Sequence, residues 1–183
     1  MCAALGDGYA VVGSDGRAIT GNGYIVESAS KKWFIDRDSI IGDLAVGCAG
    51  SGRFEMFLRD AFDLVGNDPL IRKSPQILFD KVKDLVRLDG WDFGNEPGPQ
   101  TVRGTSMVVT KDAIWRVDSD FTVYKVERRY WAIGSGEDYA LGAMHYSNRW
   151  LTDNTCDLAA VGIEAACEFH AYCGGSWQIE EIR

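Results

Sequence analysis

The chain has 183 residues, of which 46% are hydrophobic and 25% are charged, and its formal net charge is −8. These values suit a single globular domain over residues 1–183 and give no basic face for a nucleic acid partner. The sequence has no apolar run long enough for a membrane span and no secretory signal, so we expect no membrane partner. An odd number of cysteines, five, predicts reduced thiols and a cytoplasmic location.

The first half of the chain predicts strands followed by two helices. The turn Gly6-Asp7-Gly8 lies between two apolar runs and is typical of a hairpin. Apolar residues recur at helical spacing from Phe54, and Ser74-Pro75 is typical of the start of a second helix. The strands that we expect are 2–5, 9–14, 31–35 and 44–49, with a glycine-rich link over 16–23.

The second half repeats this order after a loop, which Gly, Asn and Pro residues predict over 89–104. The elements that we expect beyond it are strands over 106–110, 113–117, 122–126 and 130–133, helices over 137–150 and 157–172, and a strand over 177–182. Two pairs of amphipathic helices and many antiparallel strands predict the α+β class, as a four-layer αββα sandwich.

Four segments carry a resemblance to a known family, namely 8–18 (GYAVVGSDGRA), 31–36 (KKWFID), 46–51 (VGCAGS) and 132–140 (AIGSGEDYA). In this order and spacing they resemble the proteasome β-subunit family of N-terminal-nucleophile hydrolases across nearly the whole chain. The resemblance is greatest to the peptidase subunit of the bacterial two-component ATP-dependent protease and to small proteasome-like proteins of bacteria and phages. It implies a bacterial or phage origin.

The resemblance also implies roles for particular residues. Asp15 would hold Lys31, with Lys32 as the alternative lysine. The N–H of Gly50 would contribute to the oxyanion hole, which could supply ~3 kcal/mol of transition-state stabilisation. Ser135 would lie beside the N-terminal amine. Taken singly, the same residues could be a turn residue, a solvated strand edge, a glycine at a helix entry and a helix cap.

The nucleophile of the family is an N-terminal Thr, whereas the first Thr of this chain is Thr20. Cys2 is the candidate instead, because a small residue after Met1 favours Met1 removal and a thiolate suits a site with a lysine. The free amine of Cys2 would then act as general base. Cys48 would line the pocket for the residue before the scissile bond. We therefore expect peptide-bond hydrolysis through Cys2 after Met1 removal.

Two other functions remain open on the same fold: a catalytically inactive structural or assembly subunit, and an amidase of small molecules. The resemblance implies a peptide or unfolded protein as substrate, a homo-oligomeric ring and an ATPase unfoldase as a candidate partner. We expect no cofactor. Cys167, His170 and Cys173 are spaced by three and could share a metal, but no fourth ligand is apparent, so we predict no metal site.

Overall fold

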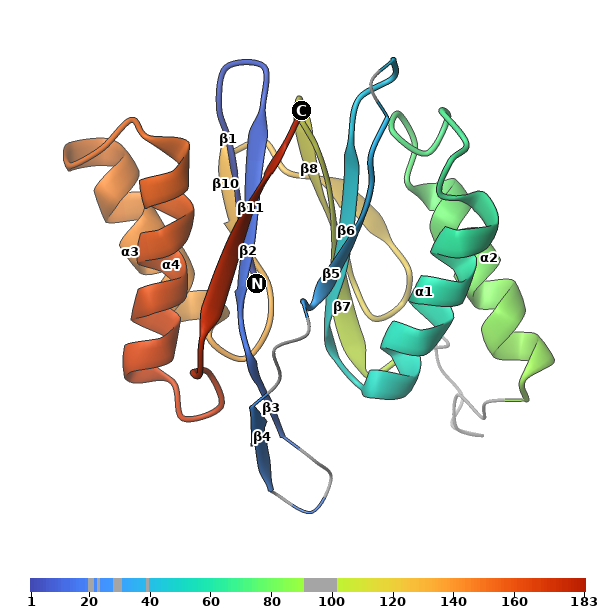
Figure 1. Ribbon diagram of the computed structural model, residues 1–183. Helices are drawn as coiled ribbons and strands as arrows, with labels where there is room; N and C mark the ends of the chain where they lie inside the picture. The colour runs from blue at the N-terminus through green and yellow to red at the C-terminus, as the bar shows by residue number, and fades with distance from the viewer. Residues whose placement is uncertain (20–21, 23, 28–30, 39, 91–101) are drawn as a thin grey trace.

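Two β-sheets stack face to face between two pairs of helices, as Figure 1 shows. The computed structural model describes residues 1–19, 22, 24–27, 31–38, 40–90 and 102–183. The arrangement confirms the predicted α+β class and the αββα layers. Both sheets are covered on their two faces, by the other sheet and by helices, so most residues of their central strands are buried.

The first sheet is antiparallel, with the strand order β10-β1-β2-β11. Its strands are Tyr130–Ala132 (β10), Cys2–Leu5 (β1), Ala10–Asp15 (β2) and Trp177–Ile182 (β11). β1 and β2 form the hairpin that the sequence predicts, with Cys2 opposite Gly13 and Leu5 opposite Ala10. The first residues of the chain therefore lie inside the sheet, between β2 and β10.

The second sheet is also antiparallel and has the order β5-β6-β7-β8-β9. Its strands are Trp33–Asp36 (β5), Leu44–Gly50 (β6), Gly104–Thr110 (β7), Ala113–Val117 (β8) and Val123–Lys125 (β9). The strand predicted over 31–35 begins two residues later than expected. Lys31 and Lys32 therefore precede β5, and this shift matters for the site.

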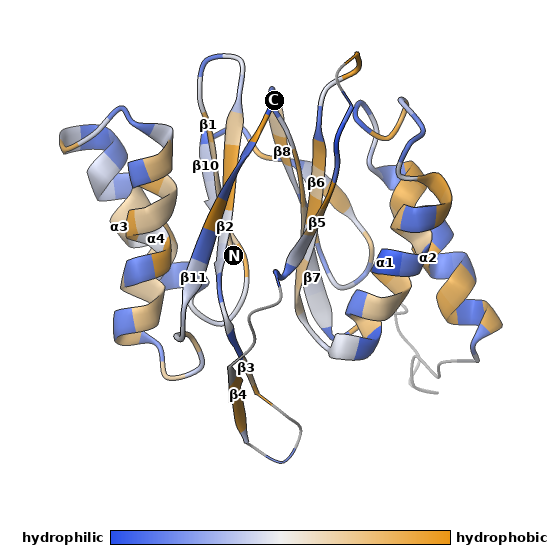
Figure 2. Ribbon diagram, in the orientation of Figure 1, coloured by the Kyte–Doolittle hydropathy of each residue, from blue (hydrophilic) through white to orange (hydrophobic). Residues whose placement is uncertain are grey.

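Helices α1 (Gly52–Val65) and α2 (Gln76–Leu88) cover the second sheet, and α3 (Glu137–Trp150) and α4 (Thr155–Phe169) cover the first. Hydrophobic and hydrophilic segments alternate along these helices (Figure 2), as expected when one face packs on a sheet. α4 begins two residues before its predicted start, because the side chain of Asn154 accepts hydrogen bonds from the N–H groups of Cys156 and Asp157. None of the helices in the described part of the chain is long and apolar enough to span a membrane.

A small hairpin projects from the sandwich at the end of β2 (Figure 1). It consists of β3 (Arg17–Ile19) and β4 (Ile25–Glu27). The sequence predicted only a glycine-rich link here, because glycines disfavour strands. Most of the loop predicted over 89–104 lies outside the described residues.

Side chains alternate between the two faces of β1. Cys2 and Ala4 belong to the apolar cluster between the first sheet and its helices, together with Met144 and Ile163. Ala3 belongs to the cluster between the two sheets, and Met1 packs against that same cluster. The direction in which each of the first residues points is thus set by the register of the β1–β2 hairpin.

Candidate active site

A cleft of about 590 Å³ opens where the two sheets meet the projecting hairpin. Its walls come from the start of β1, the end of β2, the residues before β5, the end of β6 and the turn before α3. The structure brings all the candidate site residues from the sequence to this cleft: Cys2, Asp15, Lys31, Cys48, Gly50 and Ser135. These positions are up to 133 residues apart in the chain, so the fold is what brings them together.

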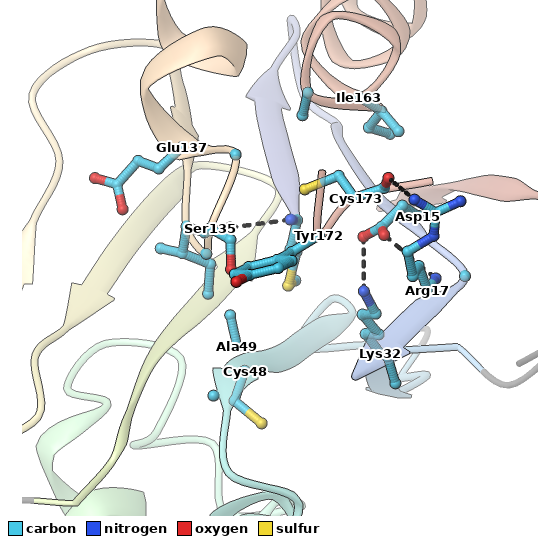
Figure 3. A pocket seen from close by; sticks show the side chains of 18 of the residues that line it. Asp15, Arg17, Lys32, Cys48, Ala49, Ser135, Glu137, Ile163, Tyr172 and Cys173 are labelled. Atoms are coloured by element: carbon cyan, nitrogen blue, oxygen red, sulfur yellow. Dashed lines mark hydrogen bonds and ion pairs between the residues drawn. The ribbon is translucent and has the colours of Figure 1, made fainter. Parts of the chain in front are cut away.

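Asp15 lies at the end of β2 and is only 7% exposed. Its Oδ1 accepts a hydrogen bond from Lys32 Nζ at 2.6 Å, as Figure 3 shows. Its Oδ2 accepts from the backbone N–H groups of Arg17, at 3.2 Å, and Gly174, at 3.1 Å. The carboxylate is therefore held in one orientation, and it fixes the Lys32 ammonium in the cleft.

Lys31 does not pair with Asp15, contrary to the expectation from sequence. Its ammonium donates instead to Glu180 on β11, which also accepts from Arg37 at 2.5 Å. The reason is geometric: the two neighbouring side chains leave the backbone in different directions, and only one of them reaches Asp15. That lysine is Lys32, which lies in a bend directly before the first residue of β5.

The α-amine of Met1 lies in the cleft and donates to the carbonyl oxygen of Ile133 at 3.0 Å. The N–H of Ile133 donates back to the carbonyl of Met1 at 2.9 Å. The Met1 side chain extends toward the second sheet, where a Cβ atom on Gly47 would lie 2.5 Å from its sulfur. Met1, which directly precedes β1, thus extends its side chain into the space between the sheets, near the backbone of Lys32.

The Cys2 side chain points toward α3 and α4 and is 2% exposed. A Cβ atom on Gly162 of α4 would lie 3.1 Å from its sulfur. Burial raises the pKa of the Cys2 thiol to about 11, although the N-terminal ammonium acts to lower it. In the chain that carries Met1, the thiol is therefore protonated and packed in an apolar layer.

Gly50 ends strand β6, and Ser135 lies on the turn before α3, which packs against the end of that strand. Gly50 has φ +132°, and a Cβ atom there would lie 2.4 Å from the carbonyl oxygen of Arg103, so only glycine fits. Gly134 has φ +106°, and its Cβ would lie 3.1 Å from Ala49 Cβ. Ser135 is exposed to the cleft two residues after Ile133, the residue that binds the N-terminal amine.

Cys48 lies on the face of β6 that packs against α1 and is 6% exposed. Burial, and after it the negative charge of Glu55, raise the pKa of Cys48 to about 12. Sequence reasoning missed Glu55, which lines the cleft from α1, and Gly174, whose N–H binds Asp15. Neither has a local sequence signal, because both reach the site through long-range packing.

Within the described residues, no group of three or more His, Cys, Asp and Glu side chains has an arrangement that could hold a metal ion. Cys173 Sγ lies 4.0 Å from His170 Nδ1, and Cys173 lines the cleft. Burial raises the pKa of this thiol, and Asp15 adds to the effect. The raised pKa keeps the Cys173 thiol largely protonated at neutral pH.

No family model and no curated protein matches the sequence. Among solved structures, the chain is similar to BPH from Thiobacillus denitrificans in complex with epoxomicin, with 22% identity and a TM-score of 0.78 over 98% of this chain and 96% of that one. It is also similar to eukaryotic HslV from Trypanosoma brucei, with 18% identity and a TM-score of 0.69 over 98% and 97% of the chains. A third similar structure is the helical assembly of the Anbu complex from Pseudomonas aeruginosa, with 15% identity and a TM-score of 0.74 over 98% and 79%.

This chain has the proteasome-type fold. The resemblance drawn from the four sequence segments is confirmed, and these segments contain residues that line the cleft. At identities of 22% and below, the likeness establishes the proteasome-type fold and leaves the chemistry to be argued from the cleft itself.

Proposed function

We propose that this chain is a proteasome-type peptidase subunit, and that hydrolysis requires Cys2 to take the place of Met1. The supporting observation is the position of the α-amine of residue 1. It is bound to Ile133 in a cleft that also holds the Lys32–Asp15 pair. An amine in the same cleft as a fixed ammonium is an arrangement that suits acyl transfer better than a purely structural role.

In this proposal, Met1 removal frees the amine of Cys2 as the general base. The amine accepts the thiol proton, and the sulfur attacks the peptide carbonyl. The Lys32 ammonium, oriented by Asp15, stabilises the thiolate. The leaving amine takes the proton, and water then hydrolyses the thioester to return free Cys2.

Two further groups have roles in the proposal. The N–H of Gly50 donates a hydrogen bond to the developing oxyanion, and this bond strengthens in the transition state. The Ser135 hydroxyl assists proton transfer next to the amine. Lys32 takes the part that the sequence resemblance assigned to Lys31.

Cys2 can reach this position only if β1 moves by one residue, because its side chain now faces α3 and α4. Such a shift turns every side chain of a strand to the opposite face. At two places in β1 the side chain would change little in size: Ala3 would take the place of Cys2, and Ala4 would take the place of Ala3. The main penalty is Leu5, which would replace the fully buried Ala4.

The turn of the hairpin can absorb the shift. At present Gly6 N–H donates to Tyr9 at 2.7 Å, which leaves Asp7 and Gly8 as a two-residue turn. After the shift Gly6 would face Ala10, and the connection would have three residues, the next most common hairpin type. Gly8, at φ +74°, supplies the backbone freedom that such a turn needs.

The test is hydrolysis of a fluorogenic peptide by the chain with and without Met1. We expect turnover only without Met1, and a loss of at least about a hundredfold in Cys2→Ala. Cys156→Ala, which changes an exposed thiol on α4, is the matched control. Because BPH has been solved with epoxomicin, this compound is a suitable competitor. Equal turnover in Cys2→Ala would contradict the proposal.

A second candidate function is a catalytically silent assembly subunit. One observation favours it: the Met1 side chain fills the space beside Lys32 while the Cys2 thiol packs in the helix layer. If β1 keeps this register without Met1, the cleft has no nucleophile. Absence of turnover in both forms, with an intact oligomer, would support this function over the first.

We also propose that the subunit forms a homo-oligomer that encloses the cleft, as a ring, and receives peptide or unfolded protein. Support for an oligomer comes from the shared fold, since one similar structure is a helical assembly of the Anbu complex. The closed ring is what the sequence resemblance implies. An ATPase unfoldase remains a candidate partner. The five cysteines are free, which suits the reducing cytoplasm. Light scattering during size-exclusion chromatography tests the oligomer, and a monomeric mass would contradict it.

A further inference from the structure

One wall of the cleft carries a carboxylate from helix α1. Glu55 lies in the first turn of α1, where its N–H donates to the carbonyl of Ser51 at 3.2 Å, and its side chain is 39% exposed. The same wall contains Cys48 and Gly52. A Cβ atom on Gly52 would meet no atom within 4 Å, so there is open space beside Glu55.

The strands behind this wall carry small side chains. Cys48 lies opposite Ser106 in the β6–β7 ladder, so their side chains share one face of the sheet. Ser106 is fully buried, and its Oγ has no hydrogen-bond partner among the described residues. Since the pKa of Cys48 is raised to about 12, its thiol stays neutral, and Glu55 supplies the charge of this wall.

Other carboxylates of the cleft already have a close cation. Asp15 binds Lys32 at 2.6 Å, and Glu137 binds Arg116 at 2.6 Å. Each of these cations neutralises its carboxylate at close range, which leaves little negative charge there for a ligand.

Glu55 differs from those two carboxylates. Its ion pair with Arg59 is 3.3 Å long, and both side chains are well exposed. The Arg59 guanidinium lies over the Phe34 ring, 4.9 Å from its centroid, and Arg59 does not line the cleft. Exposed ion pairs along a helix are weak, so Arg59 competes weakly with a cation from a ligand.

We infer that the wall formed by Cys48, Gly52 and Glu55 is a subsite for a basic side chain of a bound peptide. This inference rests on the proposed peptide cleft and specifies its substrate class. A lysine or arginine stem packs on the small surface of Cys48 and Gly52, and its cationic head pairs with Glu55. An apolar side chain of equal length would remove water from the carboxylate without replacing its interactions.

The experiment measures binding without turnover, using the chain that carries Met1. Three fluorescein-labelled Ala-Ala-X amides, with X as lysine, norleucine or glutamate, are compared by fluorescence anisotropy at low salt. Norleucine has the length of lysine without the charge. We expect the lysine peptide to bind about tenfold more tightly than the norleucine peptide, and added salt to reduce the ratio.

Variants then assign the preference to one carboxylate. Glu55→Gln should bring the lysine and norleucine affinities within about twofold of each other, and Glu55→Lys should favour the glutamate peptide. Glu137→Gln, on another wall, is the matched control and should keep the preference for lysine. A lysine preference that survives in Glu55→Gln would overturn the inference.

Two outcomes separate this inference from the proposal on which it rests. Equal binding of lysine and norleucine peptides to the unchanged chain overturns the subsite and leaves the peptide cleft intact. If none of the three peptides binds, the peptide cleft itself is contradicted and the subsite with it.

Discussion

Lys32 Nζ lies 2.6 Å from Asp15 Oδ1, and this contact ties the segment before β5 to the end of β2. Asp15 ends a strand of the first sheet and Lys32 directly precedes a strand of the second, so the ion pair links the two sheets at the cleft. Asp15 is buried and Lys32 is 28% exposed on its side chain. The contact therefore stabilises the fold and holds a positive charge at the cleft in one arrangement.

The first prediction compares the two adjacent lysines. Lys32→Met leaves Asp15 buried with only backbone donors, so we expect the free energy of unfolding to fall by about 1–3 kcal/mol. Lys31→Met removes an ion pair whose lysine is 48% exposed, and it should change stability by less than about 1 kcal/mol. Urea unfolding measures both, and equal losses would contradict the assignment of Lys32 to Asp15.

The second prediction concerns two glycines at the β6–α1 junction. Gly50→Ala places a methyl group against the Arg103 carbonyl at a positive φ, so we expect a loss of about 2–4 kcal/mol in the free energy of unfolding. Gly52→Ala is the matched control, because its Cβ meets open space at the start of α1. It should stay within about 1 kcal/mol of the unchanged chain. If Gly50→Ala left the free energy of unfolding unchanged, the backbone at this junction could relax and the prediction would be contradicted.

The third prediction follows from Glu180. Burial acts to raise the pKa of its carboxyl, but hydrogen bonds from Lys31 and Arg37 outweigh burial and lower it. A lowered pKa gives stability that is present above the ordinary value of about 4.3 and is lost as pH falls through the folded-state pKa. Glu180→Gln should therefore be less stable than the unchanged chain at pH 7. A stability gap that stays constant down to about pH 3 would contradict this account.

The fourth prediction tests the shift of β1. If Leu5 must enter the buried place of Ala4, then Leu5→Ala should ease the shift in the chain without Met1. Relief of overpacking worth about 1 kcal/mol would raise kcat/KM about fivefold. Turnover of the fluorogenic peptide measures this. A lower kcat/KM in Leu5→Ala would argue that β1 does not move.

Sequence patterns predicted those elements whose signals are local. The bounds of β1, α3 and β11 agree with the predicted ranges 2–5, 137–150 and 177–182. The sequence signals that predicted these elements are a glycine turn, a continuous amphipathic pattern and a clear strand alternation. The hairpin β3–β4 was missed because its glycines conceal the short strands on either side.

The site depends on features that are not local. Whether Lys31 or Lys32 reaches Asp15 is decided by the residue at which β5 begins, and that residue is set by pairing with β6. Whether Met1 or Cys2 faces the cleft is decided by the β1–β2 register. A shift of one residue in either register would exchange the two neighbouring residues. Spacing along the sequence does not fix these registers, so it paired Asp15 with Lys31 instead of Lys32.

The reactivity of Cys2 toward iodoacetamide, with and without Met1, tests the central claim most directly. Peptide mapping by mass spectrometry gives the labelling rate of each cysteine at pH 7, and exposed Cys156 serves as the internal reference. With Met1 present, Cys2 should react more slowly than Cys156, because it is buried and its pKa is about 11. Without Met1, we expect Cys2 to react at least about tenfold faster than Cys156, and Lys32→Met to abolish the gain. If Cys2 stays slower than Cys156 after Met1 is removed, the thiol has not entered the cleft, and a nucleophilic role for Cys2 is contradicted.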